Sequence, residues 1–502
     1  MGYNMLDQLD DYRKNDIEDY KDRIKDLSLK LGVLQRQSRE MGIPIIMVFE
    51  GWDVSGKSSY MNRMLLEMDP RSYQVYPIKV PTKEEALRPY LWRFWIKTPR
   101  KGMISIYDRS WYTGVIEDRV NGDISEERML AITDHINSFE RQLTDDGNLI
   151  IKFFLHLTFK EQERRLKKLE KEPLSPFRYL PDHWERHKHY EEYRELYERI
   201  LERTSTDWAP WHPLPAVDRE MTNLSIFETV TSIIEKRRTL MLSNKADGLP
   251  PFERPVSLEG KPSDIISKLD LTKSMDKKEY HRKLDDLQSR LIELQREVYR
   301  LKVPVMIVYS GVDAAGKGGN IRRLVQKMDP RGYKVIPISV PTDEELSHHY
   351  LWRFWKELSQ AGRINIFDRS WYGRVLVERA EDLCSENDWK RAYREINEME
   401  EQWVDSGAVL VKFWLQIDKE EQLRRFNDRL NNPYKRWKIS EDDWRNRGKW
   451  DLYMKCANEM IFRTDTDKAP WTLVEGNSKK FGRIKTLSTI VQAIENRLDS
   501  NI

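Results

Sequence analysis

The chain repeats itself once, and this duplication constrains the fold more than any other feature of its 502 residues. GWDVSGK starts at Gly51 and GVDAAGK starts at Gly311, an offset of 311 − 51 = 260 positions. The same offset joins MDPRSY to MDPRGY, and it joins the two copies of LWRFW and of DRSWY. A repeat of this length is a duplicated domain, because solenoid units are only about 20 to 50 residues long.

The repeat predicts two domains and a connection between them. We expect one domain over residues 1–243 and a second over 278–502. The stretch 244–277 between them contains GLPPFERPVSLEGKP, and its proline, glycine and charge content is typical of a linker.

Strands alternate with helices in each copy. A charged amphipathic helix precedes a buried strand (IPIIMVF or VPVMIVY), and two later apolar runs are MISIYD or RINIFD and LIIKFFLHL or VLVKFWLQI. Alternating strands and helices predict an α/β fold with a doubly wound, mainly parallel sheet. In LWRFW we expect Trp352, Phe354 and Trp355 in the core and Arg353 turned toward phosphate, with His348 and His349 on the surface.

A glycine-rich loop follows the first strand of each copy and opens a helix. Such a loop aims backbone N–H groups at an anion, and its lysine, Lys57 or Lys317, reaches the terminal phosphates. The first loop continues into Ser58 and satisfies GxxxxGK[ST], whereas the second continues into two glycines and lacks the hydroxyl that usually contacts Mg²⁺. Both loops contain an acid, Asp53 or Asp313, which would hold a phosphate-bound metal or orient an attacking oxygen.

A second acid ends the third strand, as Asp108 or Asp368. The carboxyl ends of strands face the ligand crevice of an open α/β sheet, so this is the Walker B position for Mg²⁺. A helix-capping role is the alternative. Arg109 and Arg369 follow directly, and the arginine fork suits phosphate oxygens.

A cationic stretch, RRFNDRLNNPYKRWKISEDDW, follows the fourth strand of the second copy. Its position predicts the lid of a P-loop kinase, with a capping box at Ser440 and Asp443 that starts the next helix. A solvated charged face is the alternative. The cations are Arg424, Arg425, Arg429, Lys435, Arg436 and Lys438.

Composition excludes several other classes. A net charge of +3 argues against a surface built throughout for nucleic acid, although it leaves room for a local basic groove. Two cysteines make no disulfide framework or metal-binding pattern. The sequence contains no run of about 18 apolar residues, so no membrane span is predicted, and the acidic, polar N-terminus is unlike a signal peptide. We expect a cytoplasmic protein that forms a homo-oligomer, a dimer.

These motifs together resemble the polyphosphate kinase 2 family. GVDAAGKGG, VPTDEELSHHYLWRFW, FDRSWYGR and KRWK carry the resemblance, which covers nearly all of both copies. It implies a three-layer α/β/α P-loop fold with a helical lid, reversible Mg²⁺-dependent phosphoryl transfer, and a basic channel for inorganic polyphosphate. The two-copy arrangement resembles the fused class of that family, so conversion of AMP to ADP is the expected reaction.

The resemblance also implies roles for particular residues of the second copy. Asp313 and Asp368 would act on the metal and the acceptor phosphate. Arg369 and Arg374 would stabilise the phosphoryl group during its transfer. The phosphate-binding set would be Gly311, Ala314, Ala315, Gly316, Lys317, Gly318, Gly319, Arg353, Lys435, Arg436 and Lys438.

The first copy departs from this pattern. It keeps Asp53, Lys57, Asp108 and Arg109, but Gly114 stands where the second copy has Arg374. Ser175, Pro176 and Phe177 stand opposite Lys435, Arg436 and Trp437. We therefore expect the second copy to be catalytic and the first to be impaired and mainly structural.

Three functions remain open from the sequence. The first is phosphoryl transfer between polyphosphate and a nucleotide, with AMP as acceptor and ADP or GDP as the alternative. The second is an ATP-dependent P-loop kinase acting on a small molecule. The third is a non-enzymatic polyphosphate- or nucleotide-binding protein, against which the intact Asp313 and Lys317 argue.

Overall fold

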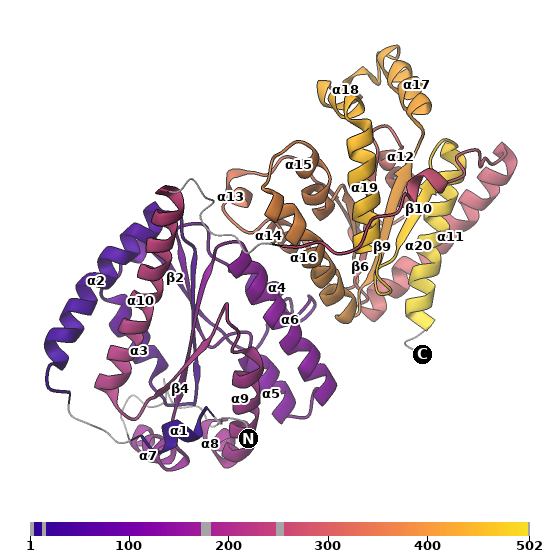
Figure 1. Ribbon diagram of the computed structural model, residues 1–502. Coiled ribbons are helices and arrows are strands. Elements are labelled where there is room, and N and C mark those ends of the chain that lie inside the picture. The colour runs from indigo at the N-terminus through magenta and orange to yellow at the C-terminus, as the bar shows by residue number, and fades with distance from the viewer. Residues whose placement is uncertain (1–4, 13–16, 172–181, 247–255, 500–502) are drawn as a thin grey trace. The chain divides into compact units, whose positions relative to one another are not determined.

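The computed structural model of the chain describes residues 5–12, 17–171, 182–246 and 256–499. The chain divides into two compact units, shown as ribbons in Figure 1. The first contains residues 1–80, 94–254 and 343–349, and the second contains residues 81–93, 255–342 and 350–502.

The first unit is built on a five-stranded parallel sheet of order β2-β3-β1-β4-β5. The strands are β1 (Ile45–Gly51), β2 (Tyr73–Pro77), β3 (Ile104–Asp108), β4 (Leu149–His156) and β5 (Trp211–Pro215). The helices of this half of the chain are α1 (Asp7–Asp10), α2 (Tyr20–Glu40), α3 (Lys57–Leu65), α4 (Trp92–Trp95), α5 (Thr113–Val120), α6 (Glu126–Asp145), α7 (Phe159–Glu170), α8 (Asp182–Lys188), α9 (Tyr190–Thr204) and α10 (Arg219–Ala246).

The second unit repeats this topology, with sheet order β10-β9-β6-β8-β7. Its strands are β6 (Val305–Gly311), β7 (Tyr333–Pro337), β8 (Ile364–Asp368), β9 (Val409–Gln416) and β10 (Trp471–Glu475). The helices of this half of the chain are α11 (Lys277–Leu301), α12 (Lys317–Val325), α13 (Asp343–Leu346), α14 (Trp352–Glu357), α15 (Val377–Ala380), α16 (Glu386–Asp405), α17 (Lys419–Leu430), α18 (Glu441–Gly448), α19 (Trp450–Thr464) and α20 (Lys479–Asp499).

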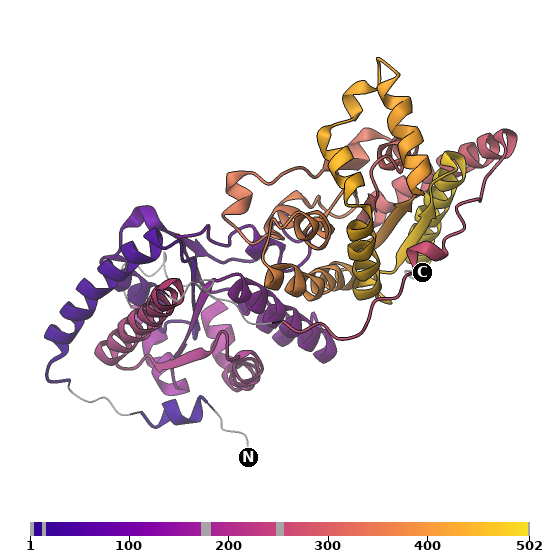
Figure 2. The same ribbon diagram turned by 45° about the horizontal axis from the view of Figure 1, so that its top comes forward.

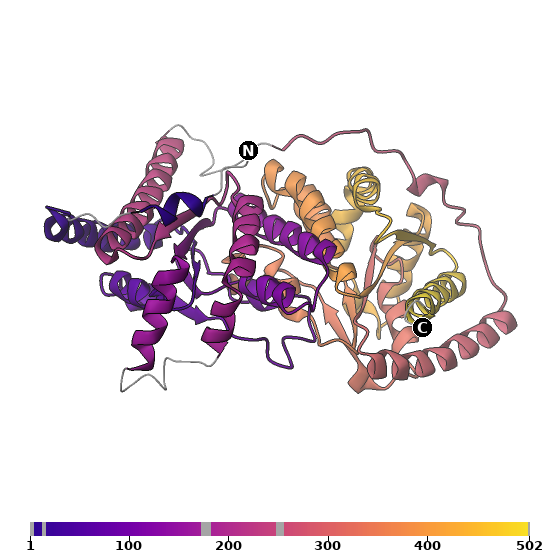
Figure 3. The same ribbon diagram turned by 90° about the horizontal axis from the view of Figure 1, so that it is seen from below.

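Helices cover both faces of each sheet, as a parallel sheet requires. In the second unit α11, α12 and α20 form one layer, and α16 and α19 lie on the other face, which Figures 2 and 3 show from two further directions. The central strand β1 is buried along its whole length, and β6 along all but its last residue, because helices cover them above and below. The expected α/β class with a parallel sheet and layered helices is confirmed.

Each unit also contains a short segment from the other copy of the repeat. Within the second unit Arg88 Nε donates to the Leu358 carbonyl at 3.2 Å, and Trp92 Nε1 donates to the Trp355 carbonyl at 2.9 Å. Within the first unit His349 is only 3% exposed and packs against Trp95, with ring centroids 5.4 Å apart. The expectation of a surface His349 was therefore wrong, because the segment that carries it is taken into the first unit.

The described part of the predicted linker lies along the second unit. Val256 N donates to Asn387 Oδ1 at 3.0 Å, and the backbone N–H groups of Ile265 and Ile266 donate to Asn458 Oδ1 at 2.9 and 3.0 Å. Helix α10 continues to Ala246, so the first residues of that stretch are helical. Among the helices that the structure describes, none is long and apolar enough to cross a membrane.

Candidate active site

The glycine loop of the second unit leads from β6 into α12, between the strands where the sheet order reverses. Gly311 has a φ of 142°, and a Cβ there would lie 2.3 Å from the Leu415 carbonyl oxygen, so only glycine lets β6 pass β9 this closely. Gly316 has a φ of 113° and turns the chain into the helix. The loop thereby points into the crevice at the carboxyl ends of the strands.

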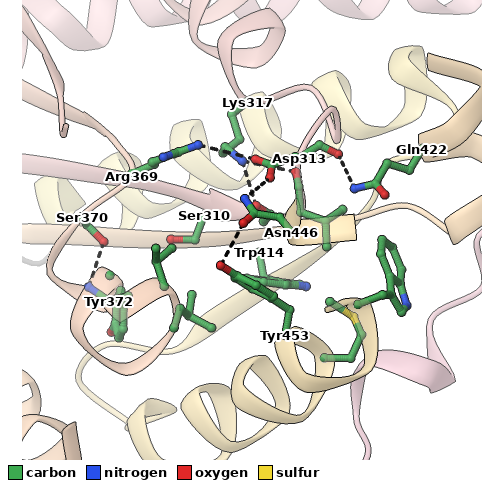
Figure 4. Close-up of a pocket in the computed structure, with 17 residues that line it drawn as sticks. Ser310, Asp313, Lys317, Arg369, Ser370, Tyr372, Trp414, Gln422, Asn446 and Tyr453 are labelled. Atoms are coloured by element: carbon green, nitrogen blue, oxygen red, sulfur yellow. Dashed lines mark hydrogen bonds and ion pairs between the residues drawn. The ribbon is translucent and has the colours of Figure 1, made fainter. Parts of the chain in front are cut away.

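Lys317 begins α12 and folds back over the loop (Figure 4). Its Nζ donates to the carbonyls of Gly311 at 2.8 Å and Val312 at 3.2 Å. Burial lowers the pKa of Lys317, and the charges of Asp313 and Asp368 act against that effect. A lysine held in this way presents a cation at the mouth of the loop, where phosphate oxygens would lie.

The negative charge of the loop acid Asp313 is only weakly balanced by its neighbours. Its Oδ2 accepts a hydrogen bond from Asn446 Nδ2 at 2.7 Å, and its Oδ1 lies 3.5 Å from the guanidinium of Arg369. The Arg369 side chain is 57% exposed, so its charge is well hydrated. Gln422 Nε2 donates to the Asp313 carbonyl at 3.1 Å and fixes the backbone rather than the carboxylate.

The Walker B turn is strained in the same way in both units. Arg369 has a φ of 67° and Arg109 a φ of 62°, which lie in the left-handed region. A non-glycine residue there costs on the order of 1–3 kcal/mol. The N–H of Arg369 donates to the Tyr309 carbonyl at 3.1 Å, and this bond holds the turn directly after Asp368.

A buried ion pair anchors the residues that follow this turn. Lys412 Nζ lies 2.8 Å from Glu400 Oε2, with both side chains at most 1% exposed. Glu400 also accepts hydrogen bonds from Trp371 and Tyr372 of the DRSWY motif. Burial lowers the pKa of Lys412, and Glu400 opposes the shift. The first unit has the same arrangement around Lys152 and Glu140, so the anchor belongs to the fold of both copies.

Two cavities meet at Asp313 and Lys317. The smaller, of about 90 Å³, is a pocket with aromatic and apolar walls, which we call the aromatic pocket. Its walls include Val312, Leu376, Val377, Trp414, Trp450, Tyr453 and Met454. The larger, of about 1300 Å³, is an open groove along the loop, α12, the start of α20 and the lid, which we call the cationic groove. Its lysines and arginines are Lys317, Arg322, Arg323, Arg369, Arg425, Arg429, Lys435, Lys438, Arg445, Lys479 and Arg483.

The lid comprises α17, a short 3-10 helix at Arg436–Lys438, and α18. The predicted capping box is present at Ser440, whose N–H donates to Asp443 Oδ2 at 2.9 Å. Lys435 and Lys438 line the cationic groove. Arg436 is not among the lining residues, and its Nε donates to the Leu430 carbonyl at 3.1 Å.

Arg425 differs from the other cations of this stretch. Its side chain is only 3% exposed and donates to the carbonyls of Ala314 at 2.9 Å, Ala315 at 3.0 Å and Gly476 at 2.6 Å. It therefore braces the back of the glycine loop. Arg424 pairs with Glu421 and Asp428 on the surface of α17.

Two predicted site residues lie away from both cavities. The guanidinium of Arg374 pairs with Glu378 at 3.1 Å and lies 4.5 Å from the centre of the Tyr350 ring. The Arg353 guanidinium lies 5.7 Å from the centre of the Phe354 ring. Neither is among the lining residues described for the pocket or the groove. Trp352, Phe354 and Trp355 are buried, as predicted.

Sequence reasoning missed several residues of the site. Asn446 and Tyr453 reach it from the lid and α19, and Arg322, Arg323, Lys479 and Arg483 line the groove from α12 and α20. The last four make no ion pair with a carboxylate of the described residues. A cation-rich start of α20, KKFGRIK, against REMTNLS in the first copy, was the available signal.

The pocket at the loop acid of the first unit, as far as the described residues line it, is nearly closed. Asp53 Oδ1 lies 2.8 Å from Arg109 and its Oδ2 lies 2.7 Å from Arg186. Although burial opposes the shift, Arg109, Arg186 and Lys57 lower the pKa of Asp53 to about 2. Tyr197 helps fill the remaining space, which is about 20 Å³.

The first glycine loop itself is intact. Lys57 Nζ donates to the carbonyls of Gly51 at 2.7 Å and Trp52 at 2.9 Å, as Lys317 does in the second unit. Ser58 Oγ donates to Asp108 Oδ2 at 3.3 Å. The predicted loss of lid cations at Ser175, Pro176 and Phe177 lies outside the described residues.

A parallel sheet whose central strand runs through a glycine loop into a helix, with an acid on the neighbouring strand, defines the P-loop class of phosphate-binding proteins. Comparison with known proteins gives the family. The polyphosphate kinase 2 profile matches residues 14–240 and 274–501, and the chain belongs to that family.

The relatives and solved structures agree. The chain is 41% identical over 462 residues to a Pseudomonas aeruginosa protein named polyphosphate:AMP phosphotransferase, covering 92% of each. It is 39% identical over 215 residues to ADP-polyphosphate phosphotransferase 3 of Rhizobium meliloti, covering 43% of this chain and 76% of that protein. A polyphosphate kinase 2 crystal structure from Pseudomonas aeruginosa superposes with a TM-score of 0.86 at 37% identity and 99% coverage of both chains.

Proposed function

We propose that the second unit transfers a phosphoryl group from inorganic polyphosphate to AMP, producing ADP, in a reversible Mg²⁺-dependent reaction. The cationic groove carries this proposal. It holds eleven lysines and arginines beside six carboxylates, starts at the glycine loop, and is long and open, which suits a linear polyanion better than a single compact phosphate group.

The donor set fits a magnesium ion. Asp313 lies in the loop, Asp368 ends the neighbouring strand β8, and both line the cationic groove, whereas the described residues contain no cluster of three or more ligating side chains. Mg²⁺ is usually held by one or two carboxylates together with water and substrate phosphates, which is what these two acids offer. When bound, the ion would neutralise charge on the reacting phosphates.

The residues of the chain would divide the work as follows. The loop amides and Lys317 hold the donor phosphates, and Asp313 orients the acceptor. A phosphate oxygen of AMP attacks the terminal phosphorus of polyphosphate, the bridging P–O bond breaks, and the chain leaves one phosphate shorter. Charge on the moving group is stabilised by Arg369 and by the lid lysines Lys435 and Lys438 when the lid closes.

The aromatic pocket suits the nucleoside of the acceptor. Trp414, Trp450 and Tyr453 offer flat apolar surface beside Asp313, and such surface holds a nucleobase without displacing its phosphate from the loop. AMP is favoured over ADP or GDP because the relative that matches the chain over 92% of its length is named for AMP. A relative that matches only 43% of the chain is named for ADP, so ADP or GDP is the second candidate acceptor.

A single assay tests the proposal. Protein, Mg²⁺, polyphosphate and AMP are mixed without ATP, and ADP is followed by chromatography, with parallel mixtures that contain ADP or GDP as acceptor. We expect ADP to form from AMP and to require polyphosphate. ADP that forms only when ATP is supplied would show a small-molecule kinase, and binding of polyphosphate without any product would show a binding protein. A dimer and a cytoplasmic location stay predictions, which ultracentrifugation and cell fractionation would check.

A further inference from the structure

One residue position distinguishes the open site from the closed one. Helix α18 brings Asn446 to Asp313, and α8 brings Arg186, at 446 − 260 = 186, to the equivalent Asp53. Asn446 Nδ2 donates to Asp313 Oδ2 at 2.7 Å, and Arg186 Nε donates to Asp53 Oδ2 at 2.7 Å. The two donors reach the same carboxylate oxygen from the same place in the fold, and only one of them is charged.

The amide leaves the charge of Asp313 in place. The donor on this carboxylate oxygen is a neutral amide, so an incoming metal ion has no cation to displace from that oxygen. Asn446 is itself held, because Tyr453 donates its hydroxyl to Asn446 Oδ1 at 3.1 Å and also reaches Glu381 at 3.3 Å. This chain of hydrogen bonds orients the amide toward the loop acid (Figure 4).

The arginine does the opposite in the first unit. Asp53 is 9% exposed and lies between two guanidinium groups, those of Arg109 and Arg186. Glu117 lies 3.6 Å from Arg109 and 3.2 Å from Arg186, so each arginine is held by two carboxylates. In the second unit Val377 stands at the position of Glu117, and within the described residues Arg369 is ion-paired with Asp313 alone.

We propose that Asn446 is a positioning residue that keeps the loop carboxylate Asp313 oriented and available, and that Arg186 is a built-in cation that occupies the equivalent metal and phosphate site of the first copy. This inference rests on the proposed function for its catalytic consequence. The residue at this position then contributes to which copy transfers phosphate, even though both copies keep the glycine loop and its lysine.

The first test places the arginine of the closed site into the open one. In the full chain, N446R should lower kcat with polyphosphate and AMP at least 100-fold, while the Kd for polyphosphate changes less than threefold. N446A should lower kcat about tenfold, and N446Q should restore part of that loss. The matched control is N431R, the same substitution at an exposed residue of the lid that lines neither cavity, and it should keep normal kcat.

The second test does not depend on turnover. Mn²⁺ binding in the presence of polyphosphate, followed by electron paramagnetic resonance, should weaken at least tenfold in N446R and stay unchanged in N431R. In a chain that carries D313N, R186N should add Mn²⁺ binding by freeing Asp53. If N446R keeps kcat and Mn²⁺ affinity within threefold of the wild type, or if R186N adds no Mn²⁺ binding, the inference is wrong.

The two tests separate this inference from the proposed function. If the wild type forms no ADP from polyphosphate, the proposed function fails. Mn²⁺ binding to Asp313 and Asp53 would still report whether Asn446 and Arg186 control the two acids. If N446R loses stability, seen as a fall in Tm that N446Q does not share, the inference is tested on the activity of N446Q and the Mn²⁺ binding of R186N instead.

Discussion

Lys57 and Lys317 form a matched pair on which the division of labour can be tested. Each begins the helix after its glycine loop, each donates to two loop carbonyls at 2.7–3.2 Å, and burial lowers the pKa of both. Truncation to alanine therefore removes the same local contacts in both units, and the two variants should lose similar stability. Any difference in activity must come from what lies beyond the loop.

The expected difference can be sized from the site. A charge-assisted hydrogen bond to phosphate contributes about 1.5–3 kcal/mol, which corresponds to roughly a 10- to 150-fold loss of kcat/KM. Because Lys317 also faces charge that develops on the moving phosphoryl group, a loss of about 10²–10³ in kcat is expected for K317A. The closed first site offers about 20 Å³ beside Asp53, so K57A should lose less than about twofold.

The assay is ADP formation from AMP and polyphosphate under saturating conditions, with Tm measured for both variants. Similar Tm values with activity lost only in K317A would support the reasoning. The reasoning is refuted if K57A loses as much activity as K317A, or if the pattern is reversed. A large fall in Tm for K317A alone would also refute it, because the two lysines make equivalent contacts.

Three further outcomes are expected. D313N and D368N should each lower activity more than 100-fold with little change in Tm, whereas D53N and D108N should keep most activity; near wild-type turnover in D313N or D368N would remove that acid from the mechanism. The double variant R322Q/R483Q should reduce the slope of log Kd for polyphosphate against log salt by about 1.4, because two phosphate contacts are lost. The control R331Q changes a residue that is 88% exposed and paired with Asp329, and it should leave that slope unchanged. AMP binding should respond little to salt in the wild type and in both variants. The folded-state pKa of Asp53, about 2, lies below its ordinary value of 3.8. The ionised acid therefore contributes stability above pH 4, and this stability is lost as the pH falls toward 2. Between pH 7 and pH 3 the free energy of unfolding of the wild type should fall by about 1 kcal/mol more than that of D53N, and equal losses would contradict the ion-pair geometry.

The parts of the site that were predicted from sequence are those whose role follows from neighbouring residues in the chain. The glycine loop, Lys317, Asp313 and Asp368 follow from a strand, a turn and a helix that are contiguous in the chain. Their positions at the carboxyl end of a parallel sheet then follow from topology. The fold class was predictable for the same reason.

What sequence reasoning missed depends on approaches between distant segments. Asn446 acquires its importance only because α18 comes over the loop, and Arg425 proves to be a brace because its side chain reaches three backbone carbonyls. Arg374 follows the Walker B turn closely in sequence, yet Glu378 and Tyr350 hold its guanidinium. The first loop is the better match to GxxxxGK[ST], but that pattern does not include Arg109 and Arg186, which form ion pairs with the loop acid Asp53.

The segments taken into each unit from the opposite copy bear on how the duplication has been maintained. A fragment that starts at residue 255 would lack residues 81–93, and so would lose Arg88 and Trp92 from its own packing. A fragment that ends at residue 254 would lack residues 343–349 and the buried His349. Neither half of the gene therefore encodes a finished unit. The copy whose loop acid is paired with two arginines therefore supplies packing residues to the second unit, and this gives selection a reason to keep it that does not depend on its chemistry.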